Sequence, residues 1–188
     1  VMNQTSQYAG TSTSAGVRGI FSSDGINTIT GNTVRNLASL APSAGTGTLA
    51  SVQGITLSTF ATSTNTVNNN TVNTLANGSS SGNVMVSGIT ISGSTATSAN
   101  TDVARNSVAG LGAPLSSGTP IIYGISLVGN PTRVFNNFVN LGSDITGAAI
   151  TAPNSFIGIN KETSATSAVN FNTVNINRAG DHGGAAYT

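Results

Sequence analysis

The sequence predicts an all-β fold, a right-handed parallel β-helix of about five coils with a repeat of about 35 residues. Three observations lead to this prediction. Two short motifs recur in phase along the chain, apolar and polar residues alternate within them, and Gly or Asn interrupts the alternation every ten residues or fewer. Alternation at period two is typical of strands, and such frequent Gly and Asn argue against helices.

The first motif is a glycine followed by a β-branched residue and further alternation. Successive copies lie 35, 34, 36 and 34 residues apart. The repeat glycines are Gly19, Gly54, Gly88, Gly124 and Gly158. In the third copy, Ile89 and Ile91 are expected to point into the core while Thr90 and Ser92 face out, and the second copy is expected to follow the same pattern.

The second motif reads apolar-x-x-Asn-x-Val and continues to a further aliphatic residue. Its asparagines are Asn32, Asn70, Asn106, Asn137 and Asn172. Because a tight corner between strands needs a residue that tolerates left-handed geometry, the asparagines are predicted to occupy the corners. Stacked coils would align them as an inward-pointing ladder of hydrogen-bonded amides. A row of Asn that binds sugar or metal is the alternative, although amides alone are weak metal ligands.

Each repeat is too short to bury its apolar face alone, so neighbouring repeats must stack. We expect a single β-helix domain over 1–188, with a lead-in at 1–16, repeats over 17–176 and a Gly-rich tail or linker at 177–188. Neither end carries a charged or amphipathic cap, which favours a segment of a longer repetitive protein or a subunit joined end to end. Polar loops at 41–47, 76–83 and 142–147 are a candidate contact surface, or plain connectors.

The amino-acid composition excludes several kinds of binding partner and site. Only 6% of residues are charged, the formal net charge is +1, and the six basic residues form no stripe, so nucleic acid is not expected to bind. The absence of cysteine excludes disulfides and thiolate metal sites. No apolar run approaches 18 residues, so no transmembrane segment is predicted.

The Gly-Ile-x-Leu strand followed by x-Asn-x-Val-x-x-Leu resembles the parallel β-helix repeats of bacterial secreted proteins. That group includes pectate-lyase-like enzymes and many large surface proteins, and the resemblance covers roughly 17–176. Its low-charge version rich in Thr, Asn and Ser is similar to repetitive surface proteins and adhesins more than to the enzymes. The resemblance implies a secreted or cell-surface module with a structural or adhesive role. Expected partners are copies of itself, neighbouring repeats or surface glycans.

A polysaccharide lyase or hydrolase is the second function considered. Such enzymes need clustered carboxylates, or a carboxylate-bound calcium ion with a base nearby. The acids are Asp24, Asp102, Asp144, Glu162 and Asp181. Acids of the first, third and fifth copies would lie about 10 Å or more apart along the axis, so no catalytic residue, cofactor or metal is assigned. His182 beside Asp181 is interpreted as part of a terminal tail.

An ice- or glycan-binding solenoid is the third function considered. Outward positions are expected to mix Thr56, Thr90 and Ser126 with Asn160, without the strict Thr-x-Thr register of a flat binding face. The aromatic residues are predicted to pack in the core or at corners, and a sugar-stacking platform is the alternative. They are Tyr8, Phe21, Phe60, Tyr123, Phe135, Phe138, Phe156, Phe171 and Tyr187.

Overall fold

A computed structural model describes residues 2–6, 16–43, 49–59, 64–80, 83–93, 100–129, 131–144, 146–162 and 165–177. Within these ranges the chain forms strands β1 to β16 and no α-helix. Every pairing between these strands is parallel, which confirms the predicted all-β solenoid.

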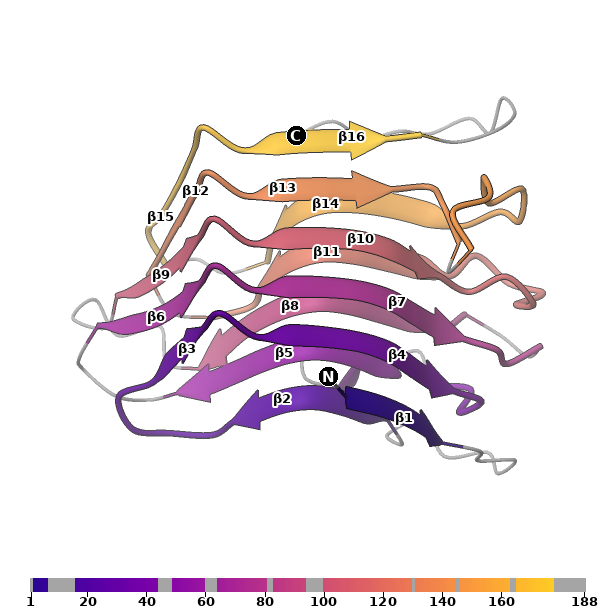
Figure 1. Ribbon diagram of the computed structural model, residues 1–188, viewed down its shortest axis with the longest axis horizontal. Helices are drawn as coiled ribbons and strands as arrows, with labels where there is room; N and C mark the ends of the chain where they lie inside the picture. The colour runs from indigo at the N-terminus through magenta and orange to yellow at the C-terminus, as the bar shows by residue number, and fades with distance from the viewer. Residues whose placement is uncertain are drawn as a thin grey trace.

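The strands form three sheets (Figure 1). Sheet A contains, in spatial order, β1 (Met2–Ser6), β4 (Thr33–Ser39), β7 (Thr71–Asn77), β10 (Ser107–Gly112), β13 (Phe138–Leu141) and β16 (Thr173–Ile176). Sheet B contains β2 (Val17–Ser22), β5 (Val52–Thr59), β8 (Met85–Gly93), β11 (Ile121–Leu127) and β14 (Ser155–Lys161). Sheet C contains β3 (Thr28–Thr30), β6 (Asn65–Asn68), β9 (Thr101–Ala104), β12 (Thr132–Phe135) and β15 (Ser167–Asn170).

The chain passes through sheets B, C and A in that order in every coil. Coil 1 is β2–β4, coil 2 is β5–β7, coil 3 is β8–β10, coil 4 is β11–β13 and coil 5 is β14–β16. Followed from β2 through β3 to β4 in Figure 1, with sheet A toward the viewer and the stack rising to the C-terminus, the chain winds in a right-handed sense. The additional strand β1 lies on β4 at the N-terminal end of sheet A.

The core is a set of aliphatic columns that run along the solenoid axis. In sheet C one column places Ile29, Val67, Val103, Val134 and Val169 in register. The members in coils 2 to 4 are fully buried, as are the corresponding valines of sheet A. Since every coil offers the same residue type at the same place, stacking alone buries the apolar face of each repeat.

The repeat glycines lie where sheet B comes closest to sheet A. A Cβ atom on Gly88 would overlap Cγ1 of Val108 in sheet A and would lie 2.6 Å from the carbonyl oxygen of Gly124 in the next coil. The other repeat glycines likewise face the first valine of the sheet A strand in their own coil. The glycines are therefore required by close approach of the two sheets, and not by a left-handed backbone.

The prediction that Thr56, Thr90, Ser92 and Ser126 face solvent is wrong, because all four are buried. Sheet B dips toward sheet A at each repeat glycine, so its outer face is concave and side chains on either side of the glycine converge. The Thr90 hydroxyl donates to Ser87 Oγ at 2.8 Å, and Thr56 donates to the buried amide oxygen of Gln53. These hydrogen bonds satisfy the hydroxyl groups of Thr56 and Thr90, whereas the Ser126 hydroxyl on the same face has no hydrogen-bond partner among the described residues.

The conformation expected for the ladder asparagines is also wrong. The left-handed residue at each corner is the one before the ladder asparagine. These corner residues are Gly31, Asn69, Arg105, Asn136 and Phe171, with φ of +69°, +54°, +53°, +57° and +54°. The preceding residue thus turns the chain, and the ladder asparagine that follows directs its side chain along the axis. Corner and ladder are separate roles held by adjacent residues.

Candidate functional site

The five motif asparagines form one continuous ladder between sheets C and A. In each step, the side-chain Oδ1 of one asparagine accepts two hydrogen bonds from the asparagine of the preceding coil. Asn70 Oδ1 accepts from the main-chain N–H and from Nδ2 of Asn32, both at 3.0 Å. The same pair of bonds links Asn70 to Asn106, Asn106 to Asn137 and Asn137 to Asn172, at 2.9 to 3.0 Å.

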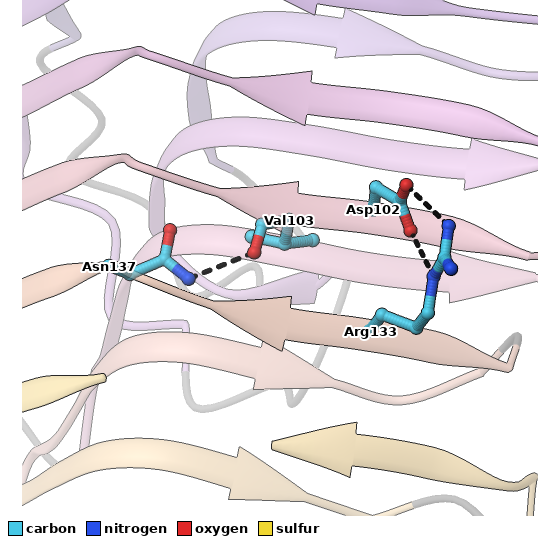
Figure 2. A network of polar contacts seen from close by, with 4 residues as sticks. All are labelled: Asp102, Val103, Arg133 and Asn137. Atoms are coloured by element: carbon cyan, nitrogen blue, oxygen red, sulfur yellow. Dashed lines mark hydrogen bonds and ion pairs between the residues drawn. The ribbon is translucent and has the colours of Figure 1, made fainter. Parts of the chain in front are cut away.

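Four of the five ladder amides also tie two coils together through a main-chain carbonyl. Figure 2 shows Asn137 Nδ2 donating to the carbonyl oxygen of Val103, at 2.9 Å. The corresponding acceptors for Asn70, Asn106 and Asn172 are the carbonyls of Ile29, Val67 and Val134. Asn70, Asn106 and Asn137 are buried. Because both ends of these buried amides are engaged in hydrogen bonds, the ladder holds neighbouring coils together.

The last coil exposes apolar residues that the preceding coils bury. Val169 is 45% exposed and Val174 is 40% exposed, whereas Val134 and Val139, the equivalent residues of coil 4, are 0% exposed. These side chains line a hollow of about 880 Å³ at the C-terminal end of the stack. It is lined by Ile157, Gly158, Ile159, Asn160, Lys161, Val169, Phe171, Asn172, Val174 and Ile176.

One ion pair joins neighbouring coils on the outer face of sheet C. Arg133 on β12 binds Asp102 on β9 through Nε at 2.6 Å and Nη2 at 2.7 Å, as Figure 2 shows. Hydrogen bonding to Asp102, and then its charge, raise the pKa of Arg133. The bidentate contact fixes the Asp102 carboxylate against a neighbouring coil.

The other described carboxylates also have local partners. Asp144 Oδ1 accepts hydrogen bonds from the main-chain N–H and Oγ1 of Thr146, both at 2.7 Å, and this lowers the pKa of Asp144. Asp24 accepts a hydrogen bond from the N–H of Gly25 at 2.8 Å. Among the described residues, no group of three or more His, Cys, Asp or Glu could hold a metal ion. Asp181 and His182 lie outside the described residues.

Glu162 receives hydrogen bonds from two coils. Its Oε1 accepts from Asn160 Nδ2 at 2.7 Å and from the Tyr123 hydroxyl at 3.2 Å. Tyr123, near the start of β11, packs in a small buried cluster with Ala50 and Met85, and its hydroxyl reaches Glu162 after β14. Burial, and then the charge of Glu162, raise the pKa of Tyr123 to about 12. This contact joins coil 4 to coil 5.

The prediction that aromatic residues pack in the core or at corners is only partly correct. Tyr123 and Phe156 are buried and Phe135 is half-buried. Phe21, Phe138 and Phe171 are exposed, and Phe171 is 87% exposed because its left-handed corner position directs the side chain outward. Arg18 lies over the Phe21 ring, 4.7 Å from its centroid. Tyr8, Phe60 and Tyr187 lie outside the described residues.

The predicted contact loops are described only in part. Residues 44–47, 81–82 and 145 of these loops lie outside the described residues. In the third loop, Asp144 organises a tight turn through its bonds to Thr146 and to the N–H of Ala148, at 3.0 Å. These contacts provide a local structural reason for the carboxylate in this loop.

Comparison with protein-family models, curated proteins and solved structures finds no match to this chain. In the described part of the chain, no helix is long and apolar enough to cross a membrane. The class of protein is therefore defined by the strand pairing itself: a parallel β-solenoid with a repeat of about 35 residues and an axial asparagine ladder.

Proposed function

We propose that the chain is a non-catalytic structural or adhesive module of a secreted or cell-surface bacterial protein, of the repetitive adhesin type. The asparagine ladder is the observation that carries this proposal. Its amides join five successive coils through paired hydrogen bonds at 2.9 to 3.0 Å. A continuous internal ladder stiffens the stack along its axis, which suits a module that presents a surface.

The placement of the carboxylates supports the same proposal. Asp102 forms a bidentate pair with Arg133, Asp144 closes a turn, and Glu162 accepts from Tyr123. Two-carboxylate hydrolysis requires one carboxyl group free to act as acid and a second free to act as base or nucleophile. Here Asp102, Asp144 and Glu162 are each held by contacts within the solenoid. Partners suited to such a module are copies of itself and surface glycans.

A cleavage assay tests the non-catalytic role against the polysaccharide-processing alternative. The chain is incubated with acidic and neutral polysaccharides, with and without calcium, while unsaturated products and new reducing ends are measured. We expect no turnover above a heat-denatured control. Turnover that the wild-type chain supports and an amide variant loses would overturn the proposal. The variants are Asp24→Asn, Asp102→Asn, Asp144→Asn, Glu162→Gln and Asp181→Asn.

The adhesive part of the proposal needs a separate measurement. Biotinylated chain is applied to an array of bacterial and host glycans, with streptavidin alone as the control. Retention on a subset of glycans is expected of an adhesive module. Absence of retention would restrict the role to a structural one.

A further inference from the structure

We propose that the open C-terminal coil docks the N-terminal coil of a second copy, so that copies stack head to tail and the asparagine ladder continues across the interface. This inference rests on the proposed structural role. The two ends of the ladder are complementary to each other, so the partner that fits the open coil is a second copy of this chain.

Coil 5 presents an apolar surface at the end of the described stack. Val169 and Val174 occupy columns whose members in coils 2 to 4 are fully buried. Phe171 at the neighbouring corner adds a further exposed apolar side chain. In the described part of the chain, β14, β15 and β16 each pair with another strand on one side only. A further coil would bury the valines and pair the free main-chain groups.

The hydrogen bonds of the ladder all run in one direction along the axis. At every step the main-chain N–H and Nδ2 of one asparagine donate to Oδ1 of the asparagine in the next coil. Asn172 ends the series, and within the described residues its main-chain N–H reaches no such acceptor. At the opposite end, Oδ1 of Asn32 receives no hydrogen bond from any described residue. Asn32 of a second copy therefore supplies the acceptor that Asn172 lacks.

The same asparagine completes the second contact of each step. The ladder amides donate to the carbonyls of Ile29, Val67, Val103 and Val134, one coil below. The next carbonyl in this column is that of Val169. Asn32 Nδ2 of the docked copy would reach Val169 as Asn172 Nδ2 reaches Val134. A coil that carries a different residue at this corner could make neither contact.

Strand β1 must be exchanged during docking. It pairs with β4 from Met2 opposite Val34 onward, and in the described part of the chain Asn32 is half-buried and Thr33 is exposed. For β16 of one copy to pair along β4 of the next, β16 must replace β1 at that edge. Removal of residues 1–6 is therefore expected to increase association.

Disulfide trapping tests the register. Thr33, Thr71, Ser107, Phe138 and Thr173 form one outward column of paired residues. In a head-to-tail stack, Thr173 of one copy pairs with Thr33 of the next at about 4.8 Å, within the Cα separation that a disulfide accepts. Within one chain these residues are four strand spacings apart, roughly 19 Å, so they cannot be bridged. The chain contains no other cysteine.

The expected result is a series of disulfide-linked dimers, trimers and longer species from the Thr33→Cys/Thr173→Cys double variant under oxidising conditions, because a head-to-tail contact does not close. The series is expected to lengthen when residues 1–6 are removed. Each single variant reports a competing arrangement. A Thr173→Cys dimer indicates tail-to-tail pairing and a Thr33→Cys dimer indicates head-to-head pairing, and either result in place of the series overturns the proposal.

A charge at the interface provides the matched control. In the double-cysteine background, Val169→Lys is expected to abolish the series, whereas Ala168→Lys, which places the same charge on the exposed outer face of β15, is expected to retain it. Circular dichroism checks that both variants are folded. A double variant that sediments as a monomer and forms no disulfide, with and without residues 1–6, overturns the docking. That outcome leaves the cleavage assay, and with it the proposed function, unaffected.

Discussion

The two ends of the solenoid carry the same motif and expose it differently. In coil 1, Ile29 is 8% exposed and Val34 is 2% exposed, while in coil 5 the equivalent Val169 and Val174 are 45% and 40% exposed. Strand β1 adds a layer to sheet A beside coil 1, whereas the hollow opens on coil 5. In sheet A the difference follows the neighbouring layer, since Val34 has β1 beside it whereas Val174 has no described strand on its outer side.

The largest difference between the middle and the end of the stack is expected when a ladder asparagine is replaced at each place in turn. Asn106→Ala leaves the Asn70 N–H and the Val67 carbonyl without partners in a buried site, and should lower the free energy of unfolding by about 4 kcal/mol. Asn172→Ala removes similar bonds at the half-buried end, where water can replace them, and should cost about 1 kcal/mol. Urea unfolding measures both variants. Equal losses would contradict the role given to the neighbouring layer.

A methyl group at a repeat glycine is expected to have the next largest effect. Gly88→Ala places Cβ against Val108 and the Gly124 carbonyl, and should cost about 3 kcal/mol because the backbone of coil 4 prevents relaxation. In Gly158→Ala the described atoms nearest to Cβ belong to the Val174 side chain at the open end, and the cost should fall to about 1 kcal/mol. Thermal unfolding compares the two. A larger loss for Gly158→Ala would show that coil 5 is more tightly held than its exposure indicates.

The core columns allow a smaller and simpler comparison. Val103→Ala removes two methyl groups from a fully buried site and leaves a cavity, so it should cost about 2 kcal/mol. Val169→Ala removes the same atoms from the exposed member of the column and should cost about 0.5 kcal/mol. Both are measured by urea unfolding at a concentration where the chain is monomeric. If association occurs, the difference between the variants should shrink as the protein concentration rises, because docking buries Val169.

The contact between Tyr123 of coil 4 and Glu162 of coil 5 predicts that the stability of the fold depends on pH. The folded chain holds the Tyr123 proton with a pKa of about 12, against 10.0 for an ordinary tyrosine. Between these values the unfolded chain loses the proton first, so stability should decrease as the pH rises from about 10 to about 12. Tyr123→Phe should flatten the dependence over this interval. A wild-type slope that matches the variant would show that the hydroxyl is not protected in the folded state.

The sequence was sufficient to predict the architecture because the repeat is in phase over five copies. Recurrence of Gly54, Gly88 and Gly124 at nearly constant spacing requires equivalent strands to lie in register, and the asparagines then stack without further assumption. The outer face of sheet B was predicted incorrectly. Strict alternation places Thr90 in solvent, but the dip at Gly88 turns it toward Ser87.

The sequence pattern also failed to predict which residue at each corner has the left-handed backbone. Asparagine tolerates left-handed φ, which suggested that Asn106 itself makes the turn, yet Arg105 does so with φ of +53°. The ladder bonds explain this, since Asn106 must direct its amide along the axis while a neighbour turns the chain. The exposure of Phe171 follows from the same rule, because residues at this position point outward whatever their type.

By itself the sequence determined the class of fold, the repeat length and the ladder residues, because these depend on periodicity, which is a one-dimensional property. Only the tertiary structure decided which coil is open, which carboxylates are paired and how the outer face of sheet B is filled. Those outcomes depend on which layers are adjacent in space. Val139 and Val174 occupy the same place in the motif, and only the coil above Val139 makes one a core residue and the other a surface.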